Sequence, residues 1–382
     1  MKKSFLILGA AIVALSSCTQ SEVLNVAQQP ERPIGFEPFV DKQTRTTSDI
    51  VDSEEPSNGF KEFYVFGAKG TGGTTNDAVF SPEETLVLDH QKVTGGKGHW
   101  EYEPHASWVA NKTFRFAAYA NGNADGSAEA AKLQNVTFVS NEAVYQKDSD
   151  GEDKVDGDGN LIVDHYVWGL DITDYTVGAR DLIAAVPEQK VVGDITTAPG
   201  SVGLTFKHIL SKVMFQFFAT NSDSNLKMEI EEFSFSTYKQ GDCKVRYTGV
   251  NDNTVIGAKW TPEGNKANYT FFDEYSWATP WTSGTINDAL YVIPQSNVGI
   301  TVTNITVLTK NVSTGEVLSK KTYTNIPLTI TDHTNWLPGY VYRYQANLTP
   351  DQHYIHFTTS VTTWIDEDNR NQTITGGAAT GE

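Results

Sequence analysis

Short stretches of alternating apolar and polar residues recur along most of this 382-residue chain. Aromatic and β-branched side chains dominate these stretches, and Gly, Asn, Asp and Pro separate them at turn spacing. Apolar residues at helical spacing are scarce. The pattern predicts an all-β protein built from sandwiches rather than from a parallel α/β sheet. The clearest expected strands are 63–66, 114–116, 212–217, 233–235, 290–293, 300–308, 341–348 and 355–364.

The length of the chain indicates two domains, because one hydrophobic core rarely organises so many residues. The best boundary is 193–203, where Pro199 and Gly200 follow small and polar residues that offer no strand register. We therefore expect an N-terminal β-sandwich at 33–200 and a C-terminal β-sandwich at 201–382, the second including a C-terminal tail.

The first residues carry the pattern of a bacterial lipoprotein signal. Lys2 and Lys3 precede an apolar run, and Leu15-Ser16-Ser17-Cys18 follows at once. The run is shorter than the roughly 20 residues that a membrane-spanning helix needs. We expect residues 1–17 to be removed and a lipid to be attached to Cys18. The alternative is an ordinary secretory signal with an incidental cysteine.

The lipid on Cys18 would hold the chain at a membrane through a polar tether, residues 18–32, which shows no periodicity. Thr19 follows the cysteine, and by analogy with known lipoproteins the lack of Asp there favours the outer membrane. We expect the ordered body to begin just after the tether, in an extended first strand. The apolar face of this strand carries Ile34, Phe36, Pro38 and Val40.

The net charge is strongly negative, −18 for the whole chain at pH 7. Removal of residues 1–17 takes away two lysines and no acid, which makes the charge −20. Phosphates repel such a body, so nucleic acid is not an expected partner. The chain also lacks a polybasic tract for anionic lipid, so membrane attachment depends on Cys18. Cys243 is the only other cysteine, which leaves no disulfide to expect and predicts a buried, inert thiol.

No local motif indicates catalysis. The sequence contains no Gly-x-Ser-x-Gly, His-Glu-x-x-His or Walker motif and no complete Gly-x-Gly-x-x-Gly. His353 and His356 lie three residues apart in an expected strand, which sends their side chains to opposite faces. We therefore expect a protein that is not an enzyme and has no cofactor, apart from one weak calcium candidate.

That candidate lies in an acidic loop, 148–164. Asp156, Asp158 and Asn160 match the spacing of the first oxygen ligands of a calcium loop. Leu and Val occupy the later positions where an EF-hand needs Gly and Glu. The alternative is an exposed hairpin turn, because Asp, Gly and Asn are also typical of turns. Any calcium bound here would be structural and of low affinity.

Two groups of aromatic residues also need an interpretation. Tyr275, Trp277 and Trp281 lie in a loop-like region, where they either bind sugar or protein as an exposed platform or pack over the end of a sandwich. Trp336 and Trp364 fall on expected strands or strand ends, and we expect them to pack in the core.

Several segments are similar in order and spacing to those of a known family. They are Arg32–Phe36 leading to Thr44-Arg45-Thr46, Asp181–Ala185, Leu204–Val213, Trp336–Tyr342, and Ile355–Phe357 ending at Val361–Trp364. Together they resemble the fimbrillin family, the subunits of protease-matured pili in Bacteroidetes. With the lipoprotein signal, the resemblance covers nearly the whole mature chain.

The resemblance implies two transthyretin-like, Greek-key β-sandwich domains in tandem, in agreement with the strand pattern. It also implies a structural pilus subunit that reaches the cell surface as an outer-membrane lipoprotein precursor, joins the fimbrium and supports adhesion. An arginine-specific maturation protease would cut between Arg45 and Thr46 and so detach the first strand. A strand of another pilus subunit would fill the open groove by β-strand addition. Arg32 is a competing cut site, although a cut there would leave the first strand attached.

The C-terminal tail fits the family less well. Val361, Thr363 and Ile365 alternate, but 366–370 introduces charge, and only Ile374 is strongly apolar beyond it. A polymerising stalk subunit is expected to present a more apolar donor strand. The alternative function is therefore a non-polymerising surface-lipoprotein adhesin or glycan-binding module, or a pilus tip subunit.

Overall fold

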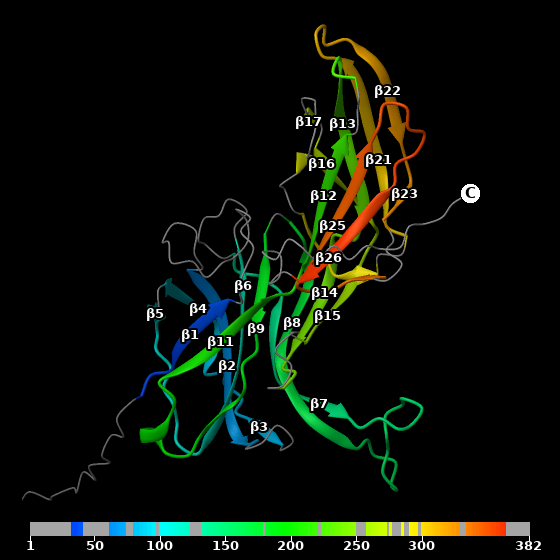
Figure 1. The fold of residues 1–382 in the computed structure, drawn as a ribbon. Helices are drawn as coiled ribbons and strands as arrows, with labels where there is room; N and C mark the ends of the chain where they lie inside the picture. Colours follow the sequence, from blue (N-terminus) through cyan, green and yellow to red (C-terminus); the bar gives the residue numbers. More distant parts are fainter. Residues whose placement is uncertain are drawn as a thin grey trace, which may run out of the picture. The chain divides into compact units, whose positions relative to one another are not determined.

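Among the residues that the computed structural model describes, the regular secondary structure consists of β-strands and one short 3-10 helix, η1 (Ile195–Thr197) (Figure 1). These residues lie in one compact unit, Arg32–Glu382. No described helix has the length and apolar character needed to cross a membrane. The all-β class is therefore confirmed, whereas the tandem transthyretin-like arrangement stays a prediction. The described residues are 32–40, 61–73, 79–96, 99–122, 131–178, 180–219, 223–249, 257–272, 275–276, 284–285, 290–296, 299–328 and 334–363.

The first sheet has nine strands in the order β1-β11-β9-β6-β2-β4-β5, with β10 against β6 and β3 against β2. Neighbours pair antiparallel, except that β1 and β11 are parallel. The strands are β1 (Gly35–Val40), β2 (Glu62–Gly72), β3 (Phe80–Pro82), β4 (Leu88–Gly96), β5 (His99–Glu101), β6 (Lys112–Asn121), β9 (Leu182–Ala185), β10 (Lys190–Val192) and β11 (Ser201–His208).

A second sheet of four strands has the order β15-β14-β8-β7. It joins strands from both sides of residue 200, because β8 pairs antiparallel with β14. The boundary at 200 stays a prediction, and the strands on its two sides share this sheet. The strands are β7 (Val136–Tyr145), β8 (Val163–Thr176), β14 (Gln240–Arg246) and β15 (Gly257–Glu263).

Three further sheets come from the C-terminal part of the chain. A five-stranded sheet has the order β18-β12-β25-β26 with β19 against β12, and a six-stranded sheet has the order β16-β13-β21-β22 with β17 and β23 alongside. The third sheet pairs β20 with β24. The strands are β12 (Ser211–Ala219), β13 (Leu226–Thr237), β16 (Ala267–Phe272), β17 (Tyr275–Ser276), β18 (Gly284–Thr285), β19 (Leu290–Val292), β20 (Gln295–Ser296), β21 (Thr301–Asn311), β22 (Val317–Tyr323), β23 (Ile326–Pro327), β24 (Asn335–Trp336), β25 (Tyr340–Leu348) and β26 (Phe357–Thr363).

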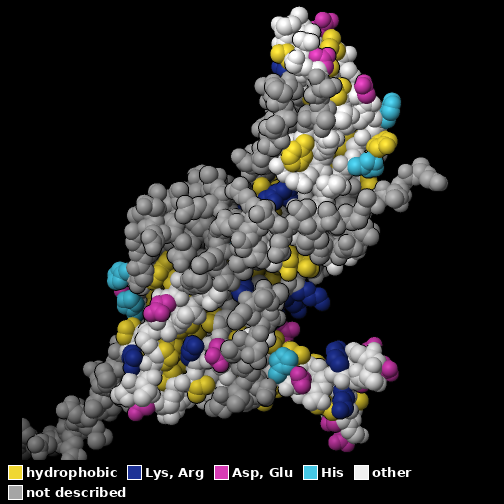
Figure 2. Space-filling view, in the orientation of Figure 1, with side chains coloured by type: hydrophobic (Ala, Val, Ile, Leu, Met, Phe, Trp, Pro, Cys, Tyr) yellow, Lys and Arg dark blue, Asp and Glu magenta, His cyan; other side chains and the backbone are white. Residues whose placement is uncertain are grey.

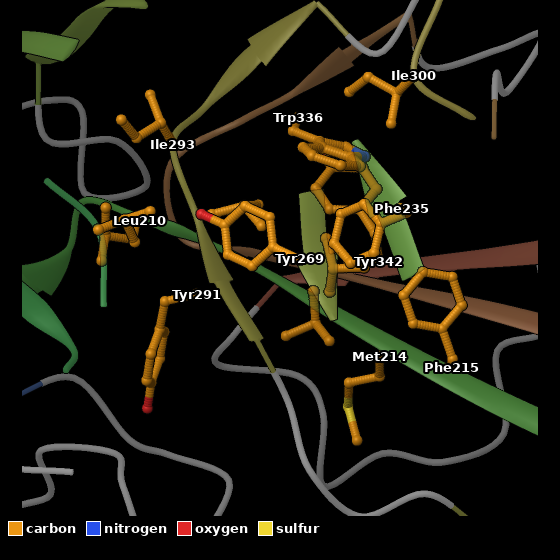
Figure 3. Close-up of a cluster of buried hydrophobic side chains, with 14 of the residues drawn as sticks. Leu210, Met214, Phe215, Phe235, Tyr269, Tyr291, Ile293, Ile300, Trp336 and Tyr342 are labelled. Atoms are coloured by element: carbon orange, nitrogen blue, oxygen red, sulfur yellow. The ribbon is translucent and has the colours of Figure 1, made fainter. Parts of the chain in front are cut away.

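Aromatic side chains fill the core of the C-terminal sheets. Figure 3 shows Trp336, Tyr342, Phe235 and Tyr269 gathered in one cluster. Phe235 and Tyr269 stack with ring centroids 5.3 Å apart, and Trp336 donates a hydrogen bond of 2.9 Å from Nε1 to the hydroxyl of Tyr344. The expected core position of Trp336 is confirmed, since it is 1% exposed. Trp277, Trp281 and Trp364 lie outside the described residues.

A separate aromatic core lies under the first sheet. It includes Phe63, Phe114, Phe116, Trp108 and Phe206, each of them almost fully buried. Strand alternation sends the four Phe side chains to one face, and Trp108 joins them from the segment between β5 and β6. This second core is the one against which the first strand packs.

Candidate functional site: the groove that holds the first strand

The first strand, β1, lies at the edge of its sheet beside β11 (Figure 1). Its residues Gly35–Val40 pair in parallel register with 201–206 of β11. β11 meets its other neighbour, β9, only at Lys207 and His208. In the described structure, residues 201–206 therefore have β1 as their partner strand, and removal of β1 would expose their backbone groups.

The segment after β5 holds the start of the first strand from the other side. The backbone N–H of Ile34 donates to the carbonyl of Ala106, and that of Trp108 donates to the carbonyl of Arg32, both at 2.9 Å. The hydroxyl of Tyr102 donates a hydrogen bond of 2.8 Å to the carbonyl of Ile34. The first strand thus lies in a groove with a backbone edge on one side and this segment on the other.

Alternate residues of the first strand point into the protein, as the sequence predicts. Ile34 and Phe36 are 1% and 5% exposed, whereas Glu37 is exposed and Pro38 is half-buried. Val40 continues the backbone pairing, and its side chain lies outside the described part. Full burial of an apolar side chain contributes about 1.5–3 kcal/mol, so Ile34 and Phe36 together contribute about 3–6 kcal/mol to holding the strand.

The ring of Phe36 occupies an aromatic pocket. It meets Phe63 and Phe116 edge to face, with ring centroids 6.0 and 5.9 Å away, and Tyr102 at 5.6 Å. Burial raises the pKa of the Tyr102 hydroxyl, which keeps it protonated as a hydrogen-bond donor. The pocket therefore accepts an apolar side chain, and its one polar group is directed at the backbone of the bound strand.

The predicted processing residues Cys18, Arg45 and Thr46 lie outside the described residues, so lipidation and cleavage stay predictions. The competing cut site, Arg32, is described. Its Nη1 donates a hydrogen bond of 2.7 Å to the carbonyl of Thr196. With its own carbonyl bonded to Trp108, Arg32 is fixed in the folded structure at the start of the groove.

The acidic loop joins β7 to β8, and residues 147–161 are exposed. Asp156 closes a turn in it, since its Oδ1 accepts hydrogen bonds of 2.9 Å from the backbone N–H groups of Asn160 and Asp158. These bonds lower the pKa of Asp156. Asp148 closes a second turn in the same way. The geometry is that expected of hairpin turns, and calcium binding by Asp156, Asp158 and Asn160 stays a prediction.

Sequence reasoning missed one group of carboxylates. Among the described residues, oxygen atoms of Asp174, Asp242 and Glu263 lie within 4.8 Å of one another. The three residues come from β8, β14 and β15, which only the sheet topology brings together. Oδ1 of Asp242 accepts a hydrogen bond of 2.9 Å from the backbone N–H of Asp174, whose φ is 54°. This contact gives Asp242 a structural role in stabilising that backbone conformation.

The chemistry of the groove is that of strand binding. It supplies a row of backbone hydrogen-bonding groups on β11 and apolar pockets for alternate side chains, which are the two requirements of β-augmentation. The residues that line it are aromatic and aliphatic. Such a surface can hold an extended segment.

Comparison with known proteins gives one family and a structural likeness. The family model described as fimbrillin-like matches residues 44–364. The crystal structure of a fimbrial protein from Bacteroides vulgatus ATCC 8482 is similar with a TM-score of 0.50 and 13% identity, covering 87% of this chain and 99% of that one. The fimbrial anchor protein Mfa2 from Porphyromonas gingivalis has a TM-score of 0.27 and 10% identity, covering 87% of this chain and 98% of that one. No curated protein sequence matches. The first likeness supports the fold.

Proposed function

The chain belongs to the fimbrillin-like family, and from this premise we propose that it is a structural, non-enzymatic subunit of a cell-surface pilus that supports adhesion. The observation that carries the proposal is the position of β1. It is an edge strand, paired with β11 and inserted by Ile34 and Phe36 into an apolar groove. A strand held in this way can be replaced by an equivalent strand of another subunit.

The proposed maturation begins with a lipoprotein precursor. Cys18 carries the lipid that delivers the chain to the outer membrane, and an arginine-specific protease then cuts between Arg45 and Thr46. The cut breaks the covalent link between β1 and the rest of the body, because it lies between the end of β1 at Val40 and the start of β2 at Glu62. The detached leader would leave with its lipid, so the anchor on Cys18 is temporary, and the mature subunit belongs to the fimbrium.

The open groove explains why a second strand would bind. Loss of β1 removes the buried contacts of Ile34 and Phe36, worth about 3–6 kcal/mol in all. It also exposes the backbone of 201–206, and an unpaired edge of this kind associates readily with extended segments. The proposed partner is a strand of another pilus subunit with apolar residues at alternate positions.

The identity of the donor separates the main proposal from its alternative. The tail from 366 to 370 is charged and polar, so it is a weak candidate for the aromatic pocket of Phe36. This observation favours, as the second candidate function, a tip subunit or a non-polymerising adhesin or glycan-binding module. Both candidates share the fold and the cell surface, and they differ in whether cleaved chains join.

Limited digestion of residues 18–382 with an arginine-specific endoproteinase tests the proposal, because trypsin would also cut after Lys42. The chain carries Cys18→Ala to remove the lipid site, and Arg45→Ala in the same background is the matched control. We expect a product that begins at Thr46 and oligomers on size-exclusion chromatography, while the control keeps its first strand and stays monomeric. A stable product that begins elsewhere contradicts the cleavage site. A monomer after cleavage at Arg45 contradicts polymerisation and supports the alternative.

A peptide experiment tests the groove separately from the tail. A synthetic peptide of residues 33–42 should bind the cleaved protein once the original strand has been washed out under mild denaturant. The same peptide with Phe36→Asp should not bind, because a carboxylate in the aromatic pocket has no partner. Equal binding of the two peptides contradicts the proposed role of the groove.

A further inference from the structure

A pocket of about 430 Å³ opens on the C-terminal five-stranded sheet. Its lining residues come from later in the chain than the residues of the β1 groove, and the two sites share none. β12 and β25 contribute Phe218, Gln345 and Asn347. Strand alternation explains why Gln345 and Asn347 line the pocket: Tyr344 and Ala346 of β25 are buried in the core, so their neighbours lie on the opposite face. The pocket therefore lies on the outer face of the sheet.

The loop from β25 to β26 forms the rest of the wall, and it is firmly attached. Lys321 Nζ donates to the carbonyls of Pro350 and Gln352 at 3.0 and 3.2 Å, and the Tyr323 hydroxyl donates to the carbonyl of Gln352 at 3.0 Å. Ile355 is 3% exposed and anchors the loop in the core. A wall fixed in this way loses little conformational entropy when a ligand binds.

Tyr354 and His356, on either side of buried Ile355, point away from the core at the pocket. Tyr354 is 68% exposed, and its ring lies 4.7 Å from that of His356, at an angle of 66°. Figure 2 shows two histidine side chains beside a hydrophobic one on the surface of the molecule. The exposed side chains of this loop include His353, Tyr354 and His356. The pocket thus has an exposed aromatic ring at its edge, and such rings are enriched where one face binds an apolar surface in water.

The described residues of the lining include no Lys, Arg, Asp or Glu, and most of the accessible surface of the pocket is apolar. It offers no guanidinium or ammonium for a phosphate or carboxylate, and no carboxylate for a cation. Gln345 Nε2 donates a hydrogen bond of 2.6 Å to Gln216 Oε1, and the Thr358 hydroxyl donates one of 3.4 Å to the carbonyl of Gln345, so Gln345 Oε1 and the Thr358 oxygen can act as acceptors. Gln352 accepts a hydrogen bond of 2.7 Å from the backbone N–H of Thr349 at Oε1, and its Nε2 is shielded from solvent and has no hydrogen-bond partner among the described residues.

We propose that this pocket binds a neutral saccharide. The C–H face of one sugar ring stacks on Tyr354, and hydroxyls of the same sugar or its neighbour donate hydrogen bonds to Gln345 Oε1 and to the hydroxyl oxygen of Thr358. A ligand rich in neutral hydroxyls and with one apolar face meets both halves of this lining, whereas an anion, a cation or a lipid chain meets at most one. The proposal goes beyond pilus assembly and does not depend on strand exchange.

Saturation-transfer NMR on residues 18–382 with Cys18→Ala tests the proposal. The probes are chitotriose, cellotriose, mannotriose and N-acetyllactosamine, each titrated up to about 10 mM, because a small open site binds with a dissociation constant of about 1 mM. We expect at least one of them to show transfer from the protein. Tyr354→Ala should weaken its binding about tenfold, since the stacked ring is lost, and Tyr354→Phe should bind more tightly than Tyr354→Ala.

Leu318→Ala is the matched control, because Leu318 is an apolar side chain that is 52% exposed and lies outside the pocket. It should leave saccharide binding unchanged. Absence of transfer from all four probes overturns the proposal. Binding that survives Tyr354→Ala at full strength places the sugar elsewhere and overturns it as well.

Discussion

The hydroxyl of Tyr102 donates a hydrogen bond of 2.8 Å to the carbonyl oxygen of Ile34. Tyr102 follows β5, whereas Ile34 precedes β1, so the bond ties the first strand to a segment 68 residues later in the chain. The ring of Tyr102 also forms part of the pocket that holds Phe36. Tyr102 therefore contacts both the backbone and a side chain of the first strand, so loss of that strand would remove both contacts.

Replacing Tyr102 by Phe should loosen the first strand while keeping the aromatic pocket. A net loss of about 1 kcal/mol is expected for one hydrogen bond. The pKa of Tyr102 is raised, so the contribution of the bond is present below the ordinary value of 10.0 and is lost as the pH rises through the higher folded value. Hydrogen exchange of residues 33–40 measures the effect. Tyr354→Phe, at an exposed tyrosine, is the control and should leave that exchange unchanged.

Phe36→Ala and Glu37→Ala should differ strongly, although the two residues are neighbours. Phe36 is buried among three aromatic rings, and loss of a buried Phe ring costs about 3–5 kcal/mol. Glu37 is exposed, and its replacement should change stability by less than about 0.5 kcal/mol. Thermal unfolding and exchange of the β1 amides compare them. Similar effects of the two substitutions would show that β1 is not inserted as described.

His90 should make the stability depend on pH in mildly acidic solution. Burial lowers its pKa from 6.5 to about 4, since the ring packs against Phe66 and Tyr64. As the pH falls, His90 binds a proton in the unfolded chain before it does so in the folded protein. The stabilisation is therefore present above pH 6.5 and is lost as the pH falls toward 4. Because the side chain is partly exposed, we expect a loss on the order of 1–2 kcal/mol.

Denaturant unfolding at about pH 7 and about pH 5 measures this loss. His90→Asn should reduce the difference between the two conditions, and Asn tolerates the positive φ of 52° at this position. His105→Asn, at an exposed histidine, is the control. An unchanged difference in His90→Asn would assign the pH dependence to other groups.

Cys243 should be unreactive in the folded protein. The thiol is buried and free, and burial raises its pKa far above the ordinary value, so little thiolate forms. In the Cys18→Ala background, a thiol reagent such as dithionitrobenzoate should react only after denaturant is added. Fast stoichiometric reaction under native conditions would contradict the buried position in β14.

The two interpretations of the acidic loop differ in one measurement. Asp156 already accepts hydrogen bonds from its own turn, so we expect the same melting temperature in millimolar calcium and in chelator. A calcium site at Asp156, Asp158 and Asn160 would instead raise the melting temperature with calcium, because an ion that binds only the folded state stabilises it. Asp156→Asn should abolish any such rise.

Local patterns predicted the faces of strands well. The alternation of β1 correctly placed Ile34 and Phe36 inside, and the expected strand at 341–348 is observed as β25 (Tyr340–Leu348). The carboxylates of Asp174, Asp242 and Glu263 were not predicted to meet, because they lie on three strands whose adjacency no local pattern encodes. The pocket at Tyr354 was missed for the same reason, since it combines a loop with the outer faces of β12 and β25.

By itself, the sequence determined the β class, the apolar face of the first strand, and the strongly negative net charge. The tertiary structure alone decided that β1 pairs in parallel with β11 and that Phe36 enters a pocket of Phe63, Tyr102 and Phe116. The physical reason is that a period of two fixes which side chains share a face, whereas every strand edge offers the same backbone groups. The choice among edges depends on side-chain packing between residues far apart in the chain, and no single stretch of sequence contains that information.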